Sequence, residues 1–136
     1  MHEIETWITE AAITLAIPFK RRTPEEGRDL VRSARAIFVE GDPRSWWLAL
    51  KLPFKQFSSD EIGLTEVLPS RDGTCLLIPE TDTEDLPVYE IEAKNVGSII
   101  GECPYFEYYV LAQDLRWLVT ESDHNIFFVC ERPSTT

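Results

Sequence analysis

The sequence predicts an α+β fold, a single domain over residues 1–136 in which N-terminal helices pack on a mainly antiparallel sheet with a C-terminal meander. Two observations predict it. Apolar residues recur at helical spacing near the N-terminus, whereas the final third holds three short strand-like segments separated by polar turns. An apolar content of 43% over 136 residues is enough for a buried core and argues against disorder.

The first segment is predicted to be an amphipathic helix that ends near Pro18. Its apolar face is formed by Ile4, Trp7, Ile8, Ala11, Ala12 and Leu15. A second helix should begin at the capping box made by Thr23 and Glu26, with Pro24 at the first helical position. Gly41 and the residues after it are expected to end that helix.

The middle of the chain is harder to assign, because "SWWLALKLPFKQF" fits both a helix and a strand. We expect a short helix over Arg44–Leu50, broken by Pro53, and a further short helix over residues 94–103. The aromatic side chains expected to be largely buried are Trp47, Phe54, Tyr108 and Phe128.

The strands are predicted near residues 74–78, 87–92, 106–112, 116–121 and 125–131. The last three follow one another closely, which predicts an antiparallel meander. The core is expected to contain Trp7, Ile8, Leu15, Leu30, Ala34, Phe38, Leu77, Tyr108, Leu118, Phe127 and Val129.

The charge is divided unequally along the chain. Residues 1–58 hold nine basic and eight acidic residues, whereas residues 59–136 hold four basic and sixteen acidic residues. An acidic half repels phosphate backbones, which argues against nucleic acid and favours a basic protein partner. The residues expected to contact that partner lie in predicted loops and are Asp60, Glu61, Asp82, Glu84 and Asp85.

Neither a cofactor nor a membrane is indicated by the sequence. Cys75, Cys103 and Cys130 form no CxxC pair, and phosphate-binding glycine motifs are absent, so no cofactor and no metal are expected. No apolar run has the length of a membrane span, and the acidic N-terminal residues do not suit a signal peptide. We therefore expect a cytoplasmic protein with reduced thiols.

The stretch "ESDHN", residues 121–125, is the strongest candidate for chemistry. Glu121, Asp123 and His124 could form a metal or acid/base cluster, which makes a small enzyme or ligand-binding domain the alternative function. Ser, Asp and Asn also favour turns, and a hairpin turn is the interpretation we prefer. No GxSxG nucleophile motif occurs, so the sequence favours a protein that is not an enzyme.

A stripe of basic residues on the second predicted helix is another candidate binding site. Arg28, Arg32 and Arg35 recur at helical spacing on the second predicted helix and could bind an anion. A solvated face paired with nearby carboxylates is the interpretation favoured by the alternating charges.

The string "EYYVLAQDLRWLVTESDHNIFFV" resembles the C-terminal signature of a family of small uncharacterised bacterial proteins. The matching positions are Glu107, Tyr108, Tyr109, Trp117, Leu118, Glu121 and His124. Ser122 and Asp123 stand where that family has Asn and His.

In size, acidity and helices-then-meander order the whole chain is also similar to the SUKH immunity proteins. That resemblance implies a non-catalytic domain that neutralises a toxin. The function we expect is therefore a protein-interaction domain, of the kind that inhibits a basic toxin.

Overall fold

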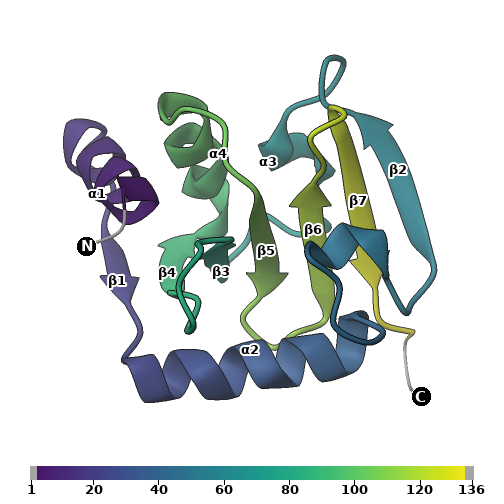
Figure 1. The fold of residues 1–136 in the computed structure, drawn as a ribbon. Coiled ribbons are helices and arrows are strands. Elements are labelled where there is room, and N and C mark those ends of the chain that lie inside the picture. Colours follow the sequence, from purple (N-terminus) through teal and green to yellow (C-terminus); the bar gives the residue numbers. More distant parts are fainter. Residues whose placement is uncertain (1–2, 134–136) are drawn as a thin grey trace.

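The computed structural model describes residues 3–133, which form a seven-stranded antiparallel sheet between two layers of helices (Figure 1). The strand order is β1-β4-β3-β5-β6-β7-β2. The strands are β1 (Phe19–Arg21), β2 (Phe54–Ser58), β3 (Thr74–Pro79), β4 (Tyr89–Glu92), β5 (Tyr108–Ala112), β6 (Trp117–Glu121) and β7 (Ile126–Glu131). The predicted α+β class is confirmed, and β5, β6 and β7 are neighbours, as the meander requires.

Within residues 3–133 the helices are α1 (Glu3–Thr14), α2 (Pro24–Phe38), the 3₁₀ turn η1 (Trp46–Leu48), α3 (Leu64–Val67) and α4 (Ala93–Glu102). The predicted capping box starts α2: Thr23 Oγ1 accepts from the Glu26 N–H, and Glu26 Oε1 accepts from the Thr23 N–H. This reciprocal pair satisfies two backbone donors that a helix start otherwise leaves without partners.

The sheet has an apolar cluster on each face, because successive residues of a strand point to opposite sides. On one face α1, α3 and α4 cover a cluster that includes Leu77 and Val119. On the other face α2 and η1 cover a cluster that includes Leu76 and Leu118. Figure 1 shows α2 running across one end of the strands, with α1 and α4 together at the opposite end of the view. Burial on both faces explains the continuous apolar sequence of the central strands.

Two predictions about the middle of the chain are wrong. The expected helix over Arg44–Leu50 is only the single turn η1, and the next segment forms the edge strand β2, with Phe54 42% exposed. Phe54 was expected to be buried, but an edge strand lacks the neighbour that would cover its side chains. The strand β1, three residues long at the other edge of the sheet, was not predicted from the sequence.

The predicted core is largely confirmed. Leu15 is the exception at 37% exposed, because α1 ends at Thr14 and the chain turns through Ala16 with a positive φ of 56°. Trp7 and Leu30 are half-buried at the margins of the two clusters. The remaining predicted core residues are buried: Ile8, Ala34, Phe38, Leu77, Tyr108, Leu118, Phe127 and Val129.

Candidate functional site

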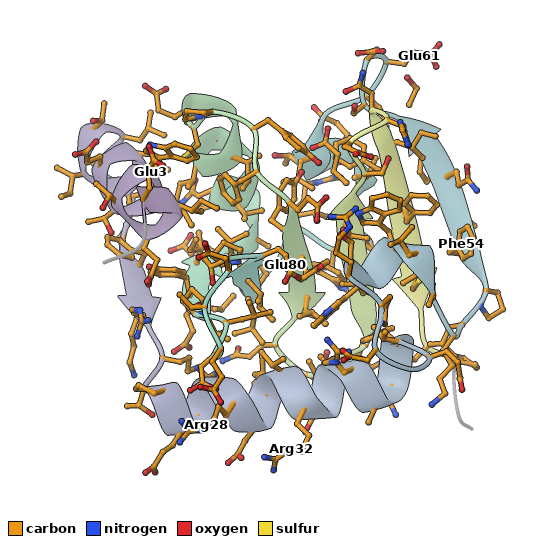
Figure 2. All side chains as sticks on the ribbon, viewed as in Figure 1. Glu3, Arg28, Arg32, Phe54, Glu61 and Glu80 are labelled. Carbon is orange, nitrogen blue, oxygen red and sulfur yellow. The ribbon has the colours of Figure 1, made fainter. Side chains whose placement is uncertain are left out.

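A groove of about 400 Å³ runs between α2 and the segment that follows β3. Its lining residues are Arg28, Val31, Arg32, Arg35, Glu80, Thr83, Glu84, Asp85 and Leu86. Figure 2 shows Glu80 near the middle of the molecule, with Arg28 and Arg32 below it on α2. The groove therefore brings residues of the predicted acidic loop and of the predicted arginine stripe to one place.

Glu80 is held at the inner end of this groove by the sheet. It follows the last residue of β3, and its N–H donates to the carbonyl of Glu107 at 2.8 Å. Its carboxylate accepts a hydrogen bond from the hydroxyl of Tyr109 on β5. Burial, together with the charge of Glu107, raises the pKa of Glu80 above its ordinary value, against the opposing effects of the Tyr109 hydrogen bond, Arg35 and Arg44.

A second carboxylate, Glu107, fixes the segment before η1 beside Glu80. The Ser45 hydroxyl donates to Glu107 Oε2, and Arg44 Nη1 lies 3.4 Å from Glu107 Oε1. The Trp46 ring stacks on Tyr109 with centroids 4.0 Å apart, and the Trp46 N–H donates to the Tyr109 hydroxyl at 3.2 Å. The root of the acidic loop is thus tied to the core through a hydrogen-bonded network.

The groove arginines are each paired with a carboxylate. Arg28 Nη1 lies 3.0 Å from Asp85 Oδ2, Arg32 Nη1 lies 3.7 Å from Asp29 Oδ1, and Arg35 Nη2 lies 2.6 Å from Asp42 Oδ1. Each arginine of the stripe thus has a carboxylate within 4.0 Å, and the Arg32 and Asp29 side chains are each 78% exposed. Among residues 3–133, by contrast, neither Glu80 nor Glu84 has a salt-bridge partner within 4.0 Å.

The structure separates the predicted partner-binding residues into two groups. Asp82, Glu84 and Asp85 lie exposed in the loop between β3 and β4. Asp60 and Glu61 lie exposed in the turn that follows β2. Figure 2 shows Glu61 and Arg28, the partner of Asp85, at opposite ends of the molecule. A partner that binds one compact surface can therefore contact one of these two acidic groups but not both.

The residues of the alternative site lie in and beside the hairpin turn between β6 and β7. Glu121 Oε1 accepts from the Tyr108 hydroxyl at 2.7 Å. His124 Nε2 lies 3.4 Å from Asp123 Oδ1, with the His124 side chain 76% exposed. The Ser122 hydroxyl accepts from the His124 N–H at 3.2 Å, which is how serine stabilises a turn.

No metal site is evident in the described part of the chain, residues 3–133, since no three His, Cys, Asp or Glu side chains cluster suitably there. Burial raises the pKa of the Cys75 thiol to about 12 and that of Cys130 to about 11, which disfavours the reactive thiolate. Burial and the charge of Glu102 also raise the pKa of Cys103.

Glu80 and Ser45 were not identified from the sequence as site residues, and Glu107 was named only as a position that matches the resemblance. The signal for Glu80 is a carboxylate placed directly after an apolar strand, "TCLLIPE". The signal for Glu107 is similar, because it directly precedes the buried strand β5. Neither position indicates by itself that the two carboxylates lie together, because that requires the β3–β5 pairing.

Comparison with protein-family models, with curated proteins and with solved structures finds no match for this chain. No helix within residues 3–133 has the length and apolar character needed to span a membrane.

Proposed function

We propose that this protein is a protein-interaction domain whose acidic loop, residues 80–86, captures a basic protein partner. The observation that carries the proposal is the combination of a fixed, half-buried carboxylate at Glu80 with exposed carboxylates at Asp82, Glu84 and Asp85. A rigid inner acid suits one inserted Lys or Arg side chain. The exposed acids, of which Asp85 is already paired with Arg28, suit long-range attraction of a positively charged surface.

The groove supports this proposal because each arginine that lines it has a carboxylate of this chain within salt-bridge distance. The arginines that line it are paired with carboxylates, whereas Glu80 and Glu84 have no cation within salt-bridge distance among residues 3–133. A guanidinium or ammonium group from a partner would supply that missing charge. Such a charge-assisted bond is stronger than a neutral one when water is excluded from it.

The class of partner that we propose is a basic toxin, with this protein as its immunity-type inhibitor. The proposal rests on the resemblance to the SUKH immunity proteins and on the net charge of −11. An inhibitor of this kind benefits from fast, electrostatically steered capture, because it must bind the toxin before the toxin acts.

A titration with a hexa-arginine peptide tests the site directly. Amide chemical shifts of the isotope-labelled protein are followed as the peptide is added. We expect saturable shifts concentrated in residues 80–86 and in the side of α2 that faces them. Equal shifts at Asp60 and Glu61, or shifts that never saturate, would show diffuse charge attraction and contradict a binding site in the groove.

The inserted side chain is tested by Glu80→Gln, which keeps the shape of the side chain and its ability to accept from Tyr109. We expect weaker peptide binding while the fold, followed by the dispersion of the same spectrum, stays unchanged. Glu66→Gln is the matched control, because Glu66 is an exposed carboxylate on α3 outside the groove. Equal losses from both substitutions would remove Glu80 from the proposed site.

A further inference from the structure

The edge strand β2 has exposed backbone and side chains along most of its length. It is the last strand of the sheet, and no described element lies beyond it (Figure 1). Its residues Phe54–Phe57 are exposed, with Phe54 42% and Phe57 38% accessible. An open edge of this kind can pair with another extended chain.

The ladder with β7 shows which backbone groups are free. Ser59 lies opposite Asn125 in the continued register, and its N–H donates to the Asn125 carbonyl at 2.9 Å. Along an antiparallel strand, the backbone N–H and C=O groups of every second residue face the partner strand. Lys55 and Phe57 therefore direct their N–H and C=O groups toward β7, whereas Phe54 and Gln56 direct theirs outward.

The side chains beside this edge are apolar and basic. Phe54 packs edge-on against Phe128, with ring centroids 5.3 Å apart, and Trp47 stacks on the same ring at 6.2 Å. Between Asp42 and Asp60 the chain carries Arg44, Lys51 and Lys55 and no acidic residue. Among residues 3–133, neither lysine has a carboxylate within salt-bridge distance.

We propose that β2 binds an extended acidic segment of another protein, which adds a strand to the sheet at this edge. The choice of partner follows from charge complementarity: the edge is basic on a chain whose net charge is −11. That net charge repels an acidic partner at long range, but screening limits its reach to about 8 Å at physiological salt. Local contacts with Lys55 then determine binding.

The register specifies what the segment must contain. Lys55 and Phe57 point to one face of the sheet, and Phe54 and Gln56 point to the other face. An antiparallel strand at this edge runs from a position opposite Phe57 to one opposite Phe54. Read in that direction, its residues should be apolar, polar, acidic and apolar, with the carboxylate beside Lys55. The sequence Val-Thr-Glu-Val satisfies this pattern, and a peptide that contains it is a suitable probe.

The test measures hydrogen exchange and peptide affinity at physiological salt. We expect the peptide to protect the amides of Phe54 and Gln56, and Lys55→Glu to weaken binding roughly fivefold, since opposed charges across strands become like charges. Lys20→Glu makes the same charge change on the opposite edge strand, β1, and should leave binding unaltered. Unprotected amides, or equal losses from both charge reversals, would overturn the proposal.

A backbone variant separates strand addition from simple charge attraction. Gln56→Pro removes an outward N–H that β7 does not use, a substitution that edge strands tolerate, and it should abolish binding. If that variant does not fold, the probe peptide with alternate amides N-methylated replaces it, and it should fail to bind the unaltered protein.

A second copy of this chain is the competing occupant of the edge. A concentration-dependent dimer of the free protein that Lys55→Glu abolishes would show that the edge pairs with itself, and would overturn the proposal of an acidic partner.

Discussion

The hydroxyl of Tyr109 donates a hydrogen bond to the carboxylate of Glu80, and this contact joins the central strand β5 to the root of the acidic loop. Tyr109 is fully buried, and its ring also stacks on Trp46. The loop that we propose as the binding site is therefore fixed by the core at its first residue, while Asp82, Glu84 and Asp85 extend into solvent.

The variant Tyr109→Phe should destabilise the fold. It removes the donor to Glu80 and leaves the Trp46 N–H without its acceptor, so we expect a loss of about 1–3 kcal/mol in the free energy of unfolding. Urea denaturation measures it. Tyr105→Phe is the control. Because Tyr105 is 54% exposed, this substitution should lower the free energy of unfolding by no more than about 0.5 kcal/mol. Equal stabilities of the two variants would contradict the network.

Glu80 should make the protein less stable as pH rises. Burial and the charge of Glu107 raise its pKa above the ordinary value of 4.5, so the folded state binds the proton more tightly than the unfolded state. This contribution is fully present below the ordinary pKa and is lost as pH rises through the folded-state pKa. As pH rises toward neutral, the unfolding free energy of the wild type should therefore fall relative to that of Glu80→Gln. A constant difference across that range would contradict the raised pKa.

Glu5 should show the opposite pH dependence. Burial opposes its ionisation, but hydrogen bonds from Arg21 Nε and the Tyr89 hydroxyl, both at 2.7 Å, outweigh burial and lower its pKa. Its stabilisation is present above the ordinary value of 4.5 and is lost as pH falls through the folded-state pKa. Glu5→Gln should cost about 1–2 kcal/mol at neutral pH, a figure reduced because Arg21 is partly exposed.

Acid titration of the unfolding free energy checks the sign for Glu5. The deficit of Glu5→Gln relative to wild type should shrink as the solution is acidified. A deficit that grows at low pH would show that the carboxylate is not stabilised as an anion.

The contrast between two phenylalanines tests the layout of the sheet. Phe127 on β7 is 3% exposed, and Phe127→Ala should cost about 3–5 kcal/mol because it leaves a cavity in the core. Phe57, its neighbour on the edge strand β2, is 38% exposed, and Phe57→Ala should cost about 1 kcal/mol or less. Thermal or urea unfolding gives both values, and similar losses would contradict an open edge at β2.

The strands of the final third could be predicted from sequence because each is short, apolar and bounded by turn residues. Asn125, for example, adopts a positive φ of 61° in the hairpin turn between β6 and β7. The strand β2 could not be predicted, because Pro53 precedes it and its aromatic and basic residues fit a helix as well. Its place at the edge depends on pairing with β7, far away in the sequence.

The candidate site was predictable only in part. Glu84 and Asp85 follow from charge and loop composition, since an acidic run without apolar periodicity is exposed. The importance of Glu80 depends on Tyr109 and Glu107, which reach it through the antiparallel pairing of β3 and β5. That pairing joins residues too distant in the sequence for local patterns to indicate.

The association rate of the hexa-arginine peptide, compared at two salt concentrations, tests the central claim most directly. The triple variant Asp82→Asn, Glu84→Gln and Asp85→Asn should slow association markedly at low salt and much less at high salt, because salt screens the steering field. The triple variant Asp60→Asn, Glu61→Gln and Glu66→Gln loses the same charge outside the groove and should slow it far less. An unchanged low-salt rate in the loop variant, or equal slowing in both variants, would contradict capture of a basic partner by the loop.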